Sequence, residues 1–358
     1  MSHVDWGTAR NTSKRFAGEY PLADTYHAHR FQLQAPDLVA RASQLVAEST
    51  GLEIPGQPEV GVISRHDWVV TNTHSFARML QPIEDASAET NGDEFAGTDP
   101  GDTARRNLPS LAGKAMGAQI GAVLGFMSKR VLGQYELVLP TGDNDFGDSV
   151  LFVGANIMSM ERQHQFRPSS FRFWVALHEC AHRAQFTGVP WMRPYFLSLV
   201  EKLISTDEPE KGRLLRISAE FRSAREAGLD PIGDKGIVGL LASPGQLEVL
   251  DRVQALMSLL EGHGHVVMDR VGEREIVDVK RMSNVLKARR KDPKSAAFMK
   301  LIGIEMKMRQ YEDGAKFINE VERLASWEAL SMAWESQESL PTIEEIRDAR
   351  LWLDRMNG

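Results

Sequence analysis

The sequence lacks several features that would place it in particular classes of protein. It has a single cysteine, Cys180, so no disulfide can form within the chain, and a reducing compartment such as the cytoplasm is expected. No uncharged apolar run approaches the ~18 residues of a membrane span, and the N-terminal stretch has no apolar core of a signal peptide. We therefore expect a soluble, cytoplasmic protein with no membrane partner.

An excess of positive charge is also missing. The chain carries 42 Lys and Arg against 49 Asp and Glu, which gives a formal net charge of −7 at pH 7. Proteins that bind nucleic acid usually carry a basic surface that neutralises phosphates, so we expect no nucleic-acid partner. With 358 residues and 42% hydrophobic content, the chain is long enough to bury a large core in one or two domains.

The most informative stretch that is present is FRFWVALHECAHRAQFTGVPW, residues 171–191. Residues 178–182 have the H-E-x-x-H pattern, and Gly188-Val189-Pro190 is typical of a helix end. Residues four apart on a helix lie on one face, so His178 and His182 can reach a single zinc ion. Glu179 lies beside them, where it can take a proton from a water on the metal. The sequence therefore predicts one catalytic zinc held by these two histidines, with Glu179 as the catalytic base.

A catalytic zinc takes three protein ligands and keeps a fourth position open. If the third ligand followed the second histidine closely, position 188 would be histidine and position 185 glycine, but the chain has Gly188 and Gln185 there. The third ligand is therefore expected from a later helix. The stretch 243–272 is the best candidate, because Ser243-Pro244 is typical of a helix start and Gly272 of a helix end.

Three polar residues follow one another along one face of that expected helix, at spacing i, i+4, i+8: Glu261, His265 and Asp269. Glu261 is the first choice for the third zinc ligand and His265 the second. Asp269, or the candidate that does not bind zinc, is expected to hydrogen-bond a histidine ligand and fix its tautomer. Candidates for stabilising an oxyanion are His263, which lies off that face, His265, Tyr135 and Tyr195.

The rest of the chain is predicted to be mostly helical. Residues 1–108 read as an N-terminal helical region that ends in an acidic loop, Gln81–Arg106, and residues 109–358 as the metal-binding region. A helix is expected to start at Ala35-Pro36-Asp37 and to stop at Gly51. Residues 53–61 read as a loop.

Two short β-type runs precede the metal-binding motif. Tyr135–Pro140 and Val150–Ile157 are joined by a turn-rich segment, so they are predicted to form a small hairpin. A third feature lies just before them, where Gly117, Gly121 and Gly125 recur every four residues. On a helix these glycines form a flat stripe that allows another helix to approach closely, and the metal-binding helix is one candidate partner.

Several segments carry a resemblance to a known family: Val4-Asp5-Trp6, GAQIGAVLGFMSKRVLGQYE, FRFWVALHECAHRAQFTGVPW, LLEGHGHVVMDRVG, KMRQYEDGAKF, and SLPTIEEI with WLDRM. Together they resemble a bacterial family of zincin-like metallopeptidases, one branch of which is associated with biosynthesis of a deazaflavin coenzyme. The resemblance implies a largely helical, zincin-like fold. Together with the residue patterns above, we expect a mainly α, zincin-like helical protein with an H-E-x-x-H helix and a small β-hairpin. It places His178, Glu179 and His182 at motif positions and supplies no substrate.

These observations predict a zinc-dependent metallopeptidase or related hydrolase that cleaves a bond in a peptide or small amide substrate. The alternative is a catalytically silent protein that uses the zincin fold for binding or scaffolding. The presence of Glu179 favours the enzyme, because a scaffold gains nothing from a base beside the metal ligands.

Overall fold

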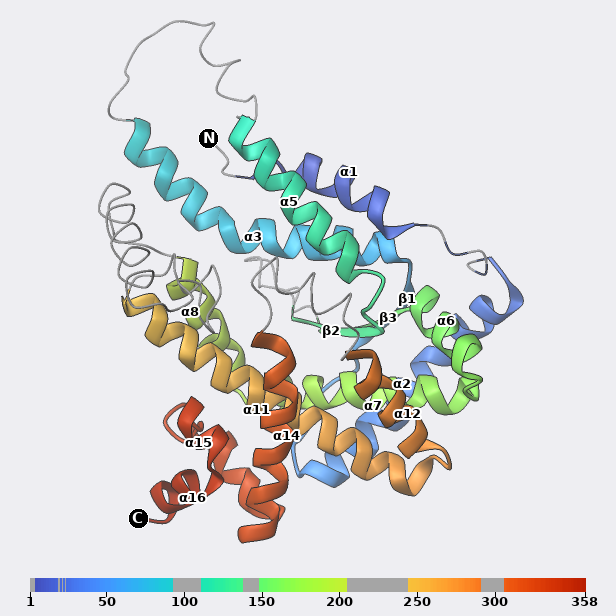
Figure 1. Cartoon of the computed structure of the whole chain (residues 1–358), viewed down its shortest axis with the longest axis vertical. Coiled ribbons are helices and arrows are strands. Elements are labelled where there is room, and N and C mark those ends of the chain that lie inside the picture. The colour runs from blue at the N-terminus through green and yellow to red at the C-terminus, as the bar shows by residue number, and fades with distance from the viewer. Residues whose placement is uncertain are drawn as a thin grey trace, which may run out of the picture. The chain divides into compact units, whose positions relative to one another are not determined.

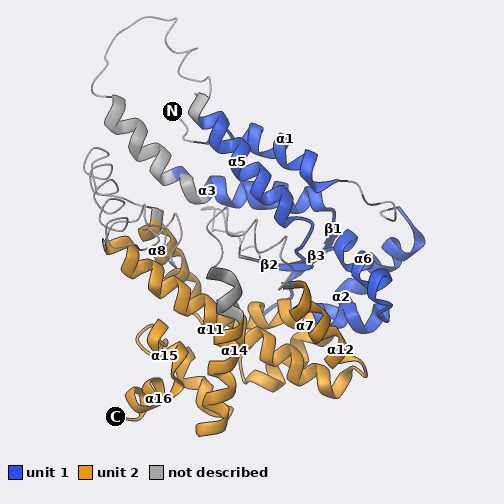
Figure 2. Cartoon of the chain, viewed as in Figure 1, with its two compact units in different colours: residues 1–40, 56–175 blue, residues 41–55, 176–358 orange. Residues whose placement is uncertain are grey.

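The computed structural model describes residues 4–18, 20, 22, 24–92, 111–137, 148–204, 244–290 and 306–358. Helices make up most of it, with one small sheet, which confirms the mainly α fold (Figure 1). Contacts divide the chain into two compact units, residues 1–40 with 56–175 and residues 41–55 with 176–358 (Figure 2). Unit 1 takes residues from both sides of the boundary expected after residue 108. That boundary lies outside the described residues and stays a prediction.

The sheet of unit 1 contains β1 (Glu59–Ile63), β2 (Gly133–Leu137) and β3 (Asp148–Val153), in the order β1-β3-β2. Strands β2 and β3 are antiparallel, with Tyr135 opposite Val150, which confirms the predicted hairpin. Its second strand is shorter than predicted, because Gly154 already begins helix α6 (Gly154–His164). The predicted turn lies mostly outside the described residues.

Strand β1 was not predicted, and its first three residues, 59–61, lie at the end of the stretch that reads as a loop. It pairs with β3 in parallel, with Glu59 opposite Ser149 and Ile63 opposite Val153. A strand of this length, close after Pro55-Gly56, has little local signal. Its parallel partner is far along the chain, and such a pairing leaves no pattern in the strand itself.

The described helices that begin in unit 1 depart from the prediction at two places. Helix α2 starts well before Ala35, with Pro36 inside it, because its buried positions Phe31, Val39 and Ala42 continue one apolar face through the proline. Helix α3 continues to Gly92, so the first part of the expected acidic loop is helical, and the rest of that loop lies outside the described residues. The described helices that precede β2 are α1 (Trp6–Ala17), α2 (Tyr26–Thr50), α3 (Arg65–Gly92) and α5 (Leu111–Met127).

The glycine stripe on α5 does allow a second helix to approach, but that helix is α1. A Cβ on Gly117 would lie 2.2 Å from the carbonyl oxygen of Asp5, and a Cβ on Gly121 2.2 Å from that of Ala9. A Cβ on Gly125 would lie 2.6 Å from the Cβ of Phe16. Close helix contact is confirmed, and the suggestion that the metal-binding helix is the partner on this stripe is wrong.

The described helices of unit 2 pack around an apolar cluster that includes Leu256, Leu259, Phe317 and Trp352. Each such side chain contributes roughly 1.5–3 kcal/mol when it leaves water. The long helix predicted for 243–272 is present as α11 and extends to Glu275. The helices are α7 (Pro168–Thr187, in unit 2 from Ala176 onward), α8 (Met192–Ile204), α11 (Pro244–Glu275), α12 (Val279–Arg290), α14 (Met306–Leu324), the 3₁₀ helix η1 (Glu328–Trp334), α15 (Ile343–Arg347) and α16 (Ala349–Asn357).

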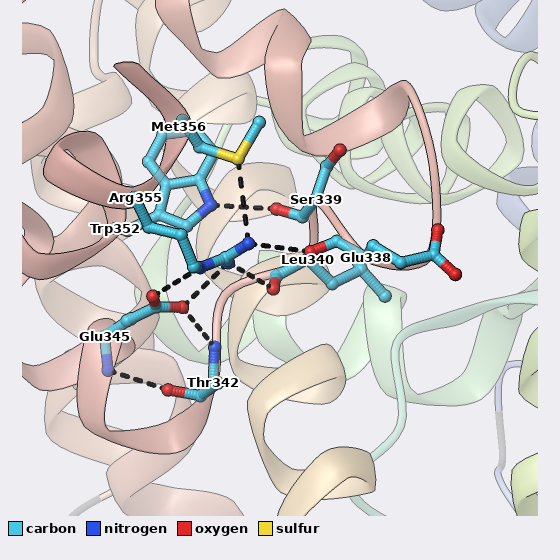
Figure 3. A network of polar contacts seen from close by, with 8 residues as sticks. All are labelled: Glu338, Ser339, Leu340, Thr342, Glu345, Trp352, Arg355 and Met356. Atoms are coloured by element: carbon cyan, nitrogen blue, oxygen red, sulfur yellow. Dashed lines mark hydrogen bonds and ion pairs between the residues drawn. The ribbon is translucent and has the colours of Figure 1, made fainter. Parts of the chain in front are cut away.

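Two ionic hydrogen bonds connect α15 to α16 at the end of the chain (Figure 3). Arg355 donates from Nε to Glu345 Oε1 at 2.7 Å and from a terminal nitrogen to Glu345 Oε2 at 2.9 Å. Glu345 also closes a capping box with Thr342 at the start of α15. Trp352 donates to the carbonyl of Ser339 at 2.8 Å. The C-terminal turn of unit 2 is therefore held by polar contacts as well as by the core.

None of the helices in the described part of the chain is long and apolar enough to cross a membrane.

Candidate metal centre

Helices α7 and α11 bring three side chains of unit 2 together. Nε2 of His178 lies 3.2 Å from Nε2 of His182. Oε2 of Glu261 lies 3.7 Å from the first of these nitrogens and 3.6 Å from the second. Among the described residues, no other group of three His, Cys, Asp or Glu side chains has its ligand atoms this close together. Of the two candidates on the later helix, Glu261 is the one in this group.

The spacing of these three atoms fits a zinc ion. Zinc binds imidazole nitrogen and carboxylate oxygen at about 2.0–2.2 Å, and tetrahedral angles then place ligand atoms roughly 3.3–3.6 Å apart. The observed separations of 3.2, 3.6 and 3.7 Å lie close to that range. Two imidazoles and one carboxylate are also a donor set that zinc uses in hydrolytic centres, with the fourth position left for water.

The local sequence explains why the two histidines face α11. The rest of α7 around them is packed on nearly all sides, with Ala176, Leu177, Ala181 and Ala184 fully buried. On the opposite helix, Gly264 presents no side chain to the rings. A Cβ built there would lie 3.4 Å from Cε1 of His182 and 3.5 Å from Cε1 of His178. The backbone of α11 is therefore in contact distance of both imidazoles.

A neighbouring glycine fixes how α11 is held from its other side. A Cβ on Gly262 would lie 2.2 Å from the carbonyl carbon of Gly314 on α14, and a Cβ on Gly314 1.8 Å from the carbonyl oxygen of Ser258. The two helices therefore cross at a point where neither has room for a side chain. Because Gly262 directly follows Glu261, this crossing fixes the backbone of α11 next to the proposed ligand.

The charge around the centre favours a cation. Burial, the largest influence, lowers the pKa of His182, but the hydrogen bond and charge of Glu261 and the charge of Glu179 together raise this pKa to about 9. Glu179 is itself buried, at 5% exposure. A group of two carboxylates and two imidazoles with little access to water is costly unless a proton or a metal ion compensates the negative charge.

The other predicted residues on α11 lie near one another but make different contacts. Nε2 of His265 is 3.6 Å from Oδ2 of Asp269, and Ser283 donates a hydrogen bond to the same oxygen at 3.0 Å. His265 is therefore placed one turn beyond Glu261, beside Asp269 and outside the group of three ligand atoms. A role for either residue in supporting a metal ligand or an oxyanion stays a prediction.

His263 is enclosed by aromatic rings. It stacks on Trp327 with ring centroids 5.9 Å apart and meets Trp334 edge-on at 5.1 Å. Burial, with a smaller contribution from the charge of His182, lowers the pKa of His263 to about 3, so the ring is neutral at ordinary pH. The surroundings of His263 are those of a packed side chain, and an oxyanion role for it stays a prediction.

One polar residue of the centre, Gln185, is not predicted by the H-E-x-x-H pattern. Gln185 is fully buried, and its side-chain oxygen lies 2.9 Å from Nδ1 of His182. Its side-chain nitrogen lies 2.9 Å from the carbonyl oxygen of Leu260 and 3.0 Å from Nδ1 of His263. The available signal was its position three residues after His182, on the same face of an otherwise apolar helix.

Two histidines four residues apart, a glutamate directly after the first, and a carboxylate from a later helix are the arrangement typical of zincin-type metallohydrolases. The chain belongs to the zincin-like metallopeptidase family, whose family model matches residues 4–353. This confirms the resemblance found in the sequence segments, and membership of the family implies zinc binding.

A solved structure is similar over the whole chain. It is the crystal structure of a putative hydrolase with a novel fold from Chloroflexus aurantiacus, with 28% sequence identity and a TM-score of 0.70. The alignment covers 99% of each chain. Among curated proteins, none matches this chain.

Proposed function

We propose that this protein is a zinc-dependent hydrolase that cleaves a peptide or amide bond, with His178, His182 and Glu261 as the zinc ligands. The observation that carries the proposal is the convergence of their three ligand atoms, 3.2 to 3.7 Å apart. A zinc ion held there would supply Lewis acidity and lower the pKa of a bound water to about 7. Family membership and the similarity to a crystal structure described as a hydrolase support the same class of reaction.

Glu179 is the proposed general base. It follows His178 directly on α7, it is buried, and its charge raises the pKa of His182, which supports a place for its carboxylate near the ligands. Its carboxylate takes one proton from the attacking water and passes it to the nitrogen of the leaving amine as the amide bond breaks. The products are then a carboxylic acid and an amine. General acid–base catalysis of this kind contributes about 10²–10⁴-fold to a rate.

The test combines metal analysis with an activity screen. Zinc is measured by mass spectrometry on the purified protein, and hydrolysis on a library of peptides and small amides. We expect one zinc per chain, and we expect Glu179→Gln to keep the zinc while losing about 10²-fold or more of the turnover.

Two other results would contradict parts of the proposal. Zinc in the wild type with no hydrolysis of any member of the library would favour the alternative of a binding or scaffolding protein. No zinc after refolding in excess zinc would contradict the metal site itself.

A further inference from the structure

We propose that Gln185 is a positioning residue for the metal centre, which orients His182 and holds it in the tautomer that can bind a metal. The inference rests on the metal site of the proposed function and does not depend on hydrolysis. It concerns an amide that sequence patterns of zinc peptidases do not assign.

The orientation of the Gln185 amide follows from its partner on α11. The carbonyl oxygen of Leu260 can only accept a hydrogen bond, so the group 2.9 Å from it must be the amide nitrogen of Gln185. The amide oxygen then faces Nδ1 of His182, at 2.9 Å. An amide oxygen also can only accept, so this Nδ1 must carry a proton.

That proton determines which nitrogen of His182 is free to bind a metal. A neutral imidazole carries one proton, so with Nδ1 protonated the lone pair is on Nε2. Nε2 is the nitrogen that lies 3.2 Å from Nε2 of His178 and 3.6 Å from Oε2 of Glu261. The hydrogen bond that His182 donates to Gln185 therefore leaves free the same nitrogen that the geometry of the centre requires.

The other end of the amide is anchored in the core of unit 2. The second N–H of Gln185 faces Nδ1 of His263 at 3.0 Å, so this nitrogen accepts, and the His263 proton is on its Nε2. The rings of Trp327 and Trp334 confine the His263 ring. Gln185 thus connects His182 to two fixed acceptors, Leu260 and His263, and rotation of its amide would break all three contacts.

An amide at this position differs from the more common carboxylate partner of a metal-binding histidine. It fixes the tautomer without adding negative charge to a centre that already has Glu179 and Glu261. A carboxylate would also place an oxygen against the carbonyl of Leu260, where only a donor fits. The amide is therefore the group that satisfies both helices.

Zinc affinity tests the role directly, by competition with a chromophoric chelator. Gln185→Leu keeps the size of the side chain but removes both the acceptor and the donors. Loss of such a partner typically weakens metal binding by 10–100-fold, and we expect a loss in that range. The matched control is Gln246→Leu, which removes an amide hydrogen bond of the same 2.9 Å length, to the carbonyl of Leu203. Gln246 lies roughly 22 Å from Glu261 along α11, so the zinc affinity of Gln246→Leu should stay within about twofold of the wild type.

A second readout distinguishes positioning from a structural role. In the zinc-loaded wild type, ring-¹⁵N NMR should show His182 protonated on Nδ1 and metal-bound through Nε2, a result that holds even if Gln185→Leu fails to fold. An unprotonated Nδ1, or a Gln185→Leu affinity within about threefold of the wild type, would overturn the inference.

Absence of zinc from the wild type would overturn the inference together with the metal site. Zinc binding with the expected loss in Gln185→Leu but no hydrolysis would support the inference and count against the hydrolase alone.

Discussion

Gly262 on α11 and Gly314 on α14 meet backbone to backbone, since a Cβ on Gly262 would lie 2.2 Å from the carbonyl carbon of Gly314. Each position requires glycine because a side chain there would collide with the backbone of the other helix. The contact fixes α11 directly beside Glu261, so the stability of the helical core and the geometry of the metal centre depend on the same crossing.

The first prediction concerns this crossing. Gly314→Ala places a methyl group against the carbonyl oxygen of Ser258 and should lower the free energy of unfolding by about 1–3 kcal/mol, as overpacking does. Chemical denaturation measures the change. Gly245→Ala is the control, because a Cβ there meets nothing within 4 Å and alanine favours a helix. Equal stability of Gly314→Ala and wild type would contradict the close crossing.

The second prediction separates the two candidates for the third ligand. Glu261→Gln should reduce zinc affinity strongly, because it replaces the only carboxylate among the three converging atoms of the described residues. His265→Ala should reduce affinity less, since Nε2 of His265 faces Asp269 at 3.6 Å. Both affinities are measured by chelator competition. A larger loss in His265→Ala would make His265 the ligand.

The third prediction concerns pH and the C-terminal turn. Burial raises the pKa of Glu345. Hydrogen bonds from Arg355 and Thr342 and the charge of Arg355 together lower this pKa by more than burial raises it, so the net pKa is below the ordinary value of 4.5. A carboxylate whose pKa is lower in the folded state than in the unfolded state stabilises the folded protein at pH values above the unfolded-state pKa. This stabilisation is lost as pH falls through the folded-state pKa.

Glu345→Gln should therefore lose about 1.5–3 kcal/mol at pH 7, and the difference from the wild type should shrink as pH falls below the ordinary pKa of 4.5. Thermal unfolding across this pH range measures it. Glu344→Gln, at the exposed neighbouring position, is the control and should show little change at any pH. A difference between Glu345→Gln and wild type that is constant with pH would contradict the ionic origin of the effect.

The fourth prediction concerns metal removal. Dialysis against a zinc chelator should abolish any hydrolytic activity, and added zinc should restore it. The metal-free centre leaves two carboxylates and two imidazoles together with little water, so chelation should also lower the melting temperature. Activity that survives complete zinc removal would contradict a zinc-dependent reaction.

Local patterns in the sequence were sufficient for much of the candidate site. The placement of His178 and His182 on one face follows from helix geometry alone. Helix α11 has clear signals at both ends of its predicted range. The prediction of Glu261 then needed only the requirement that a catalytic zinc has a third protein ligand. The hairpin of β2 and β3 is also local, because its strands are close in sequence.

Features that depend on distant partners could not be predicted in the same way. The glycines of α5 indicate a close helix contact, but they do not indicate that the backbone of α1 fills it. Strand β1 forms because β3 offers it a parallel edge. Gln185 has a role only because Leu260 and His263 of another helix determine which way its amide points.

The most direct test of the metal centre is a crystal structure of the protein grown with zinc, with diffraction data collected on both sides of the zinc absorption edge. We expect one strong anomalous peak at bonding distance, about 2.0–2.2 Å, from Nε2 of His178, Nε2 of His182 and a carboxylate oxygen of Glu261. No peak between these three atoms, or a zinc peak bound by other residues instead, would contradict the account.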